Sequence, residues 1–191
     1  VSIEATGELM SAADVIVATG GPGMVKAAYS SGKPSLGVGQ GNVQCIVDRD
    51  ADLKDAAAKI ILGRSFDNGL ICLGEQTAFI PEEKFDEFVR EFKAQGAFYV
   101  EGAEQTAKLR EGIFPGGGPI SREVVGLSAE QVGEKIGIQV PAGTRVIAAT
   151  AEKVGSGDDL CREKLCPVIN LMPYGSFEEG VAKMVENLEF E

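Results

Sequence analysis

Short apolar runs alternate along the chain with longer segments in which apolar residues recur every three or four positions. The short runs are typical of buried strands, and the longer segments are typical of helices that bury one face. Their alternation predicts an α/β fold. The expected strands span residues 15–18, 45–48, 77–80, 97–100, 145–149 and 167–172.

Five helices are expected, in addition to a helix-like stretch at the start of the chain. The first runs from 23 to 31 and ends at Gly32, because glycine readily adopts the left-handed conformation that closes a helix. The second can be capped by Asp50 or Asp52, and the third begins at Pro81. Their buried faces consist of Leu53, Ala57, Ile60 and Ile61 in the second helix and Phe85, Phe88, Val89 and Phe92 in the third.

The other two helices begin with capping boxes, in which paired side chains satisfy backbone donors of the first turn. The pairs are Ser128 with Gln131 and Ser176 with Glu179. The segment 112–126 is rich in glycine and proline, so we expect a long, mobile surface loop there. The chain starts without Met and stops after a helix where a returning strand is expected, which we interpret as a fragment of a longer protein.

Charge and composition narrow the class of protein. The chain carries 18 basic and 29 acidic residues, a net charge of −11, so nucleic acid is not an expected partner. No apolar run approaches the roughly 20 residues that span a bilayer, and the first residues lack the pattern of a signal peptide. We therefore expect a globular, cytoplasmic protein with no membrane partner.

The chain contains four cysteines and no histidine. Cys45, Cys72, Cys161 and Cys166 show neither the CxxC spacing of zinc and redox sites nor the density of a disulfide-rich domain. Without histidine, serine–histidine and cysteine–histidine catalysis are excluded within this chain, and no metal site is expected. All the cysteines except Cys72 are predicted to be packing residues.

Cys72 is the candidate nucleophile. It lies in SFDNGLICLGEQ, just past a helix, where Asn68 and Gly69 interrupt the helical periodicity and predict a compact turn. A thiol on such a turn can face a cleft and attack a carbonyl, while nearby backbone N–H groups stabilise the oxyanion. The alternative is a small buried hydrophobic residue, as most free cysteines are.

A glycine turn after the first predicted strand is a second candidate site. Thr19, Gly20, Gly21 and Gly23 connect this strand to a helix, a geometry that presents free N–H groups to a phosphate. The full GxGxxG pattern is absent, so a simple strand-to-helix turn is the alternative.

Three segments together resemble the CoA-acylating aldehyde dehydrogenases, including the aldehyde dehydrogenase half of bifunctional aldehyde-alcohol dehydrogenases. The segments are ATGGPGMVKAAYSSGKPSLGVGQGN, FDNGLICLGEQ and REKLCPVI, in the same order and at similar separation as in that family. The resemblance implies an aldehyde dehydrogenase-like catalytic domain at 37–191, with three layers and a mostly parallel sheet. It also implies that residues 1–36 are the end of a Rossmann-like domain that binds a nicotinamide cofactor.

The resemblance further implies a two-step reaction. Cys72 attacks an aldehyde, hydride passes to NAD(P), and CoA attacks the resulting thioester to give an acyl-CoA. Asn68, in the same motif, is expected to belong to the catalytic set. The residues expected to contact the cofactor are Thr19, Gly20, Gly21, Gly39 and Glu163.

Two residue identities bear on this assignment. Gly37 stands where hydrolytic relatives carry a glutamate that activates water, so the thioester is expected to persist until CoA attacks it. A tight passage between domains is the other interpretation of residues 37–42. Glu163 resembles a carboxylate that lies beside the nicotinamide ribose in relatives, and a surface charge before a strand is the alternative.

The expected partners are a small aldehyde, CoA and further copies of the chain in a homo-oligomer, in the cytoplasm or in a bacterial microcompartment. Other functions stay open: a hydrolytic or acyl-phosphate-linked member of the superfamily, or a non-catalytic fragment for oligomer assembly. The isolated fragment is expected to be inactive, because other parts of the enzyme would lie outside it. The sequence does not distinguish between aldehydes, or between NAD and NADP.

Overall fold

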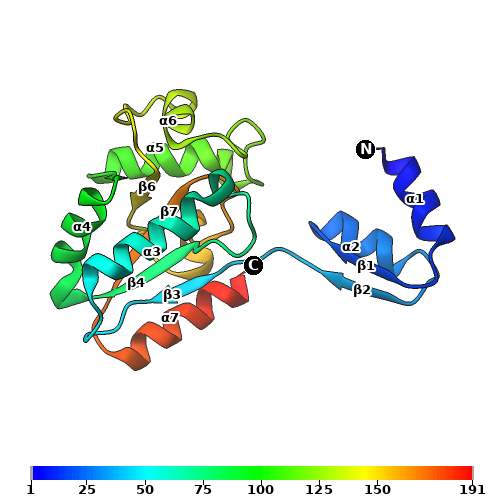
Figure 1. The fold of residues 1–191 in the computed structure, drawn as a ribbon, viewed down its shortest axis with the longest axis horizontal. Helices are drawn as coiled ribbons and strands as arrows, with labels where there is room; N and C mark the ends of the chain where they lie inside the picture. Colours follow the sequence, from blue (N-terminus) through cyan, green and yellow to red (C-terminus); the bar gives the residue numbers. More distant parts are fainter. Residues whose placement is uncertain (1, 191) are drawn as a thin grey trace. The chain divides into compact units, whose positions relative to one another are not determined.

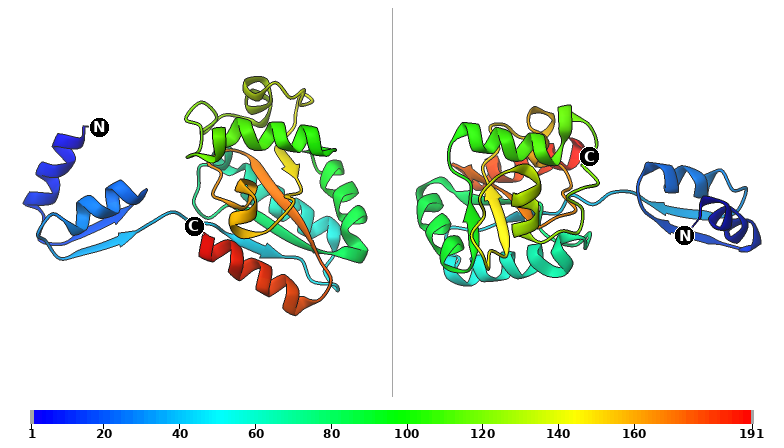
Figure 2. Two further views of the ribbon diagram at one scale, coloured as in Figure 1. Left: turned by 180° about the vertical axis from the view of Figure 1, so that it is seen from behind. Right: turned by 90° about the horizontal axis from the view of Figure 1, so that it is seen from above.

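The computed structural model describes residues 2–190 and divides the chain into two compact units, Val1–Gly41 and Asn42–Glu191. Both units are drawn in Figure 1 and, from two further directions, in Figure 2. Among the described residues, no helix is long and apolar enough to cross a membrane. The expected assignment of residues 1–36 to a cofactor-binding domain and of 37–191 to a catalytic domain stays a prediction.

The smaller unit is a β–α–β arrangement preceded by a helix (Figure 1). Its elements are α1 (Ile3–Ala12), β1 (Ile16–Thr19), α2 (Pro22–Tyr29) and β2 (Ser35–Val38). The two strands pair in parallel, and a small core beneath them consists of Met10, Ile16, Ala18 and Ala28. Gly32 follows α2 with φ +77°, as predicted, whereas the strand β2 was not predicted.

The larger unit contains five parallel strands in the order β3-β4-β7-β6-β5. The strands are β3 (Gln44–Ile46), β4 (Thr77–Pro81), β5 (Ala97–Tyr99), β6 (Val146–Ala149) and β7 (Val168–Tyr174). The α-helices are α3 (Leu53–Ser65), α4 (Phe85–Ala94), α5 (Ala103–Ile113), α6 (Ala129–Ile136) and α7 (Phe177–Phe190). Short 3₁₀ turns are η1 (Phe66–Gly69), η2 (Glu82–Lys84), η3 (Pro115–Gly117), η4 (Gly155–Gly157) and η5 (Asp159–Cys161).

Helices cover both faces of this sheet (Figures 1 and 2). Because successive side chains of a strand point to opposite faces, Ala78 and Ile80 of β4 pack with α3 and α4, whereas Phe79 joins the core formed with α5, α6 and α7. Strands of a parallel sheet that is buried on both faces have nearly continuous apolar sequences. The predicted α/β class with three layers is therefore confirmed.

The predicted helix starts are largely confirmed. Asp52 caps α3, since its side chain accepts a hydrogen bond from the Asp55 amide at 3.0 Å, and Ser128 with Gln131 forms a complete capping box on α6. The predicted start at Pro81 is wrong. Pro81 is the last residue of β4, and η2 intervenes before α4 begins.

The start of α7 differs from the predicted capping box in one bond. Ser176 accepts a hydrogen bond from the Glu179 amide at 3.2 Å, as predicted. The Glu179 carboxylate, however, accepts from the amide of Gly175, at 2.8 Å. The returning bond of the capping box thus comes from the residue before Ser176 and not from Ser176 itself.

The segment 112–126 is only partly the surface loop that was predicted. Helix α5, which the sequence analysis missed, extends to Ile113. Phe114 and Val124 are then each only 1% exposed and belong to the core beneath α5 and α6. These two buried residues, Phe114 and Val124, therefore divide the segment into shorter surface turns.

Candidate functional site

The turn that carries Cys72 begins where α3 ends. Asp67, Asn68 and Gly69 follow the helix with φ values of 48°, 51° and 74°. Asp and Asn are the non-glycine residues that adopt this left-handed conformation most readily. Three consecutive left-handed residues reverse the chain sharply, and Cys72, three residues after Gly69, is exposed. The alternative that Cys72 is a buried hydrophobic residue is wrong.

Hydrogen bonds attach this turn to the rest of the larger unit. The Asn68 side-chain amide donates to the carbonyl of Gly126 at 3.0 Å, and the Gly126 amide donates to the carbonyl of Leu165 at 2.9 Å. The segments 66–74, 121–127 and 163–166 therefore meet at one place. Asn68 has a clear role in holding the turn, and its expected catalytic role stays a prediction.

Glu163, expected to contact the cofactor, lies in the third of these segments. Its side chain is buried, with the residue 7% exposed, so the alternative of a surface charge is wrong. The adjacent Lys164 is fully buried, and its ammonium donates to the carbonyls of Leu160 and Arg162, each at 2.7 Å. Its backbone amide donates to Gln76 Oε1 at 2.9 Å. The backbone that carries Glu163 is thus fixed on both sides.

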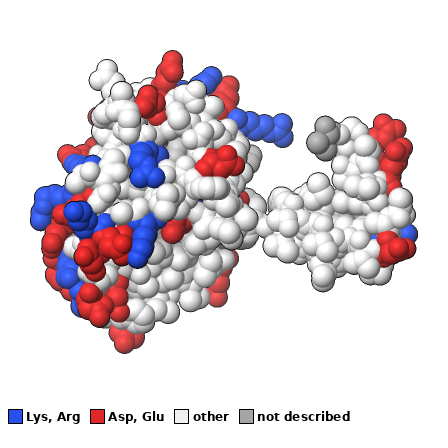
Figure 3. Space-filling model, in the orientation of Figure 1, with Lys and Arg blue, Asp and Glu red and all other residues white. Residues whose placement is uncertain are grey.

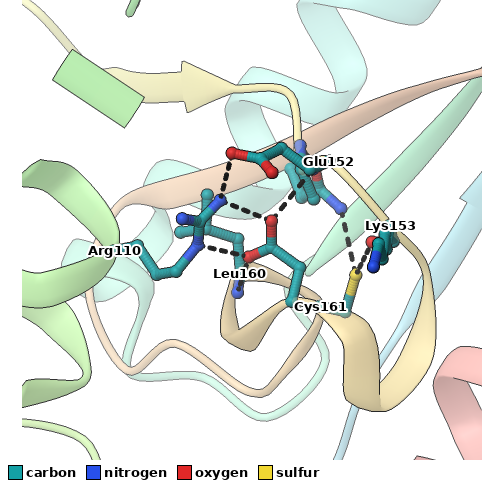
Figure 4. A network of polar contacts seen from close by, with 8 residues as sticks. Arg110, Glu152, Lys153, Leu160 and Cys161 are labelled. Atoms are coloured by element: carbon teal, nitrogen blue, oxygen red, sulfur yellow. Dashed lines mark hydrogen bonds and ion pairs between the residues drawn. The ribbon is translucent and has the colours of Figure 1, made fainter. Parts of the chain in front are cut away.

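An ion pair with a buried carboxylate supports the loop that leads to Glu163 (Figure 4). Arg110 of α5 donates from Nε and Nη2 to the two oxygens of Asp158, at 2.7 and 2.6 Å. The same carboxylate accepts from the amides of Glu152 and Leu160, at 2.9 and 3.0 Å. Bidentate pairing of this kind fixes orientation as well as distance. Asp158 therefore joins the two ends of the loop between β6 and Glu163, through the amides of Glu152 and Leu160.

The four cysteines lie in different environments. Cys161 and Cys166 are fully buried in the core, Cys45 is half-buried, and Cys72 is exposed. Burial raises the pKa of Cys45, Cys161 and Cys166 to about 11 in each case. A thiol with a raised pKa stays protonated at neutral pH, and the thiolate is the reactive form. The prediction that these three cysteines are packing residues is confirmed.

Limiting iodoacetamide at neutral pH should therefore label Cys72 first in the native chain. Raising a thiol pKa from 9.0 to about 11 lowers the thiolate population about 100-fold at neutral pH, and burial also restricts access. Peptide mass spectrometry would give the four rates separately. The urea-denatured chain is the control, in which the four rates should converge, whereas equal rates in the native chain would contradict the assignment.

The other predicted cofactor residues lie in the smaller unit. Thr19 ends β1, Gly20 donates its amide to the Val38 carbonyl at 3.1 Å, and Gly21 is the N-cap of α2. No atom lies within 4 Å of the position that a Cβ would occupy at Gly21 or Gly39. There is therefore free space beside the backbone at these two glycines.

Gly37 has a packing role of its own. A Cβ at this position would lie 2.8 Å from side-chain atoms of both Tyr29 and Val25, and the Gly37 amide donates to the Tyr29 hydroxyl at 3.1 Å. A larger residue would push α2 away from β2. This close packing lies within the smaller unit, so the tight passage between domains that was considered for residues 37–42 stays a prediction, as does the effect of Gly37 on the thioester.

One buried residue next to the candidate site was not singled out from the sequence. Arg64, in the last turn of α3, is fully buried. A basic residue in a last helical turn usually lies in solvent, so its position along the helix gave no indication. The sequence does contain one hint, since Gly69 and Gly74 flank Cys72 and leave room for a large neighbouring side chain.

Comparison with known proteins decides the family. The sequence model described as the aldehyde dehydrogenase family matches residues 10–108. The chain belongs to the aldehyde dehydrogenase family. It is 46% identical to succinate-semialdehyde dehydrogenase (acetylating) of Clostridium kluyveri over 190 residues, all of this chain and 42% of that relative. The chain thus spans about two fifths of this family member's length.

Two solved structures of the family have the same fold. An acetylating aldehyde dehydrogenase from Geobacillus thermoglucosidasius is 36% identical, with a TM-score of 0.92 over 99% of this chain and 42% of its own. A propionaldehyde dehydrogenase from Rhodopseudomonas palustris, described with bound CoA and an acylated cysteine, is 29% identical, with a TM-score of 0.87 over 97% of this chain and 42% of its own. The predicted resemblance to acylating members of the family is confirmed.

Proposed function

We propose that this chain is the catalytic-cysteine part of an enzyme that interconverts an aldehyde and an acyl-CoA, with Cys72 as the nucleophile and NAD(P) as the cofactor. The observation that carries the proposal is the exposure of Cys72 on a left-handed turn, while the other three thiols are wholly or partly buried. The acylated cysteine described for the Rhodopseudomonas palustris relative supports it.

The proposed chemistry balances around the sulfur of Cys72. The thiolate forms a bond to the aldehyde carbon, and the carbonyl oxygen becomes the oxyanion of a hemithioacetal. Loss of hydride from that carbon leaves a thioester on Cys72, and the nicotinamide ring of the cofactor supplies the hydride acceptor when bound. The CoA thiolate then attacks the thioester carbon and expels the Cys72 thiolate. One thioester replaces another, so the energy of the oxidation is retained.

Each of the two units, taken by itself, contains residues whose chemistry suits such a cofactor. The open backbone at Gly21 and Gly39 allows the close approach that a phosphate requires. Glu163, although only 7% exposed in the described chain, has a carboxylate, a group that can accept hydrogen bonds from two ribose hydroxyls. We assign these residues, with Thr19 and Gly20, to cofactor contact as part of the proposal.

Acceptor dependence tests the proposal in a complete enzyme that carries this chain. NADH or NADPH formation from a small aldehyde should require CoA and should not be supported by phosphate or water alone. Formation with phosphate would favour an acyl-phosphate-linked enzyme, and formation with water would favour a hydrolytic one. Either result would overturn the CoA-acylating proposal, whereas the location in the cytoplasm and the homo-oligomeric state stay separate predictions.

A further inference from the structure

The guanidinium of Arg64 lies between the Cys72 turn and the segment that carries Glu163. Its Nη2 is 3.4 Å from the carbonyl oxygen of Gly69, in the Cys72 turn. The same nitrogen donates to the carbonyls of Lys164 and Cys166, in the other segment. A single side chain thus contacts two segments about a hundred residues apart in the sequence.

The backbone around Arg64 is shaped to hold this side chain. A Cβ at Gly69 would lie 2.9 Å from Arg64 Nη2 and 2.5 Å from the Cys166 carbonyl oxygen, and one at Gly74 would lie 3.3 Å from Arg64 Nη1. Both glycines that flank Cys72 therefore allow the turn to close around the guanidinium. Gly69 additionally has φ +74°, a conformation that other residues rarely adopt.

Arg64 remains a cation in this position at neutral pH. Burial lowers its pKa to about 10, while the charges of Glu163 and Glu75 oppose that decrease. Hydrogen bonds from a charged donor are about twice as strong as neutral ones. The hydrogen-bond contact of Arg64 with the turn goes to the carbonyl of Gly69, so its influence on Cys72 is exerted through the position of the turn.

We propose that Arg64 is a positioning residue that clamps the Cys72 turn to the segment 163–166 and thereby fixes the nucleophile relative to Glu163. The catalytic meaning of the clamp rests on the proposed function. The clamp itself is a property of the folded chain and can be tested without turnover.

Hydrogen exchange of the 191-residue chain tests the clamp directly. In Arg64→Met, amides of 69–74 and 163–166 should exchange at least about tenfold faster. Loss of a charge-assisted hydrogen bond is expected to make local opening of these segments more frequent by this factor. Amides of α4 and α6 should keep their rates. Arg64→Lys should lie between the parent and Arg64→Met, because an ammonium can donate to some of the same carbonyls but lacks the planar fork.

A glycine pair provides a matched comparison that leaves Arg64 in place. Gly69→Ala should push the turn off the Cys166 carbonyl and accelerate exchange in both segments. Gly143→Ala introduces similar backbone strain, at φ +81°, but has no atom within 4 Å of its new Cβ, so neither segment should change. If Arg64→Met fails to fold, this glycine pair decides the test.

Measurements of kcat and KM distinguish a positioning role of Arg64 from a role in overall stability alone. In a complete enzyme that carries this chain, Arg64→Met should lower kcat about 100-fold, as expected for a small misplacement of a reacting group, with KM for the aldehyde within about twofold of the parent. Arg64→Lys should restore part of kcat. Faster exchange in only one segment, or a Gly69→Ala chain that behaves like Gly143→Ala, would overturn the clamp. Inactivity of the parent with CoA would instead count against the proposed function alone.

Discussion

Replacing Cys72 with serine should lower acyl-CoA formation by about four orders of magnitude or more in a complete enzyme that carries this chain. A serine hydroxyl is scarcely ionised at neutral pH, and no histidine is available in this chain to deprotonate it. Steady-state kinetics at saturating CoA would measure the loss. A mass spectrum of the intact protein after incubation with an acyl-CoA should show an acyl adduct in the parent and none in Cys72→Ser.

Cys45→Ser is the matched control for this loss. Cys45 undergoes the same chemical change but is half-buried beside the core of α3 and α4, so the rate should stay within about twofold of the parent. Substantial activity in Cys72→Ser, together with a changed oligomer size, would favour the alternative of a non-catalytic assembly fragment.

Replacing Asp158 with alanine should lower the free energy of unfolding by about 3–5 kcal/mol. The substitution removes all four hydrogen bonds that the carboxylate accepts and leaves the Arg110 guanidinium, whose side chain is 23% exposed, without its main partner. This is a large fraction of the 5–15 kcal/mol that typically stabilises a domain. Urea unfolding at neutral pH, followed by circular dichroism, would measure it.

Glu152→Gln is the control for the Asp158 substitution. Its carboxylate also faces Arg110, but at 3.6 Å and with 64% of the side chain exposed, so its loss should cost less than about 1 kcal/mol. Charged side chains of both signs lie over the face of the larger unit shown in Figure 3, and exposed pairs of this kind contribute little individually. Equal destabilisation by the two variants would contradict a special role for the buried carboxylate.

The sequence predicted those parts of the fold that depend on local pattern. The phenylalanine stripe of α4 is confirmed, with Phe88 and Phe92 fully buried, because period and side-chain size both favour one helical face. Helix α5 was missed because its buried side includes Thr106 beside Leu109 and Ile113, so the apolar pattern is short. Strand β2 was missed because its four residues include a glycine and no continuous apolar run.

The candidate site was predictable in part. Cys72 and the turn before it follow from a local motif, in which Asn68 and Gly69 break the helix. The burial of Arg64 could not be predicted in the same way, because its partners are backbone carbonyls about a hundred residues further along the chain. Only the folded chain brings these carbonyls next to α3.

The hydrogen bonds of Asn68 and Arg64, the two side chains that hold the Cys72 turn, end on main-chain oxygens of Gly126, Lys164 and Cys166. Every amino acid supplies the same carbonyl group, so these acceptors do not depend on which side chains the exposed positions of the two supporting segments carry. Substitutions at exposed positions such as Arg122 and Glu123 should therefore leave the anchoring acceptors of the turn in place. Sequence divergence at such exposed positions is thus compatible with a fixed location of the Cys72 turn.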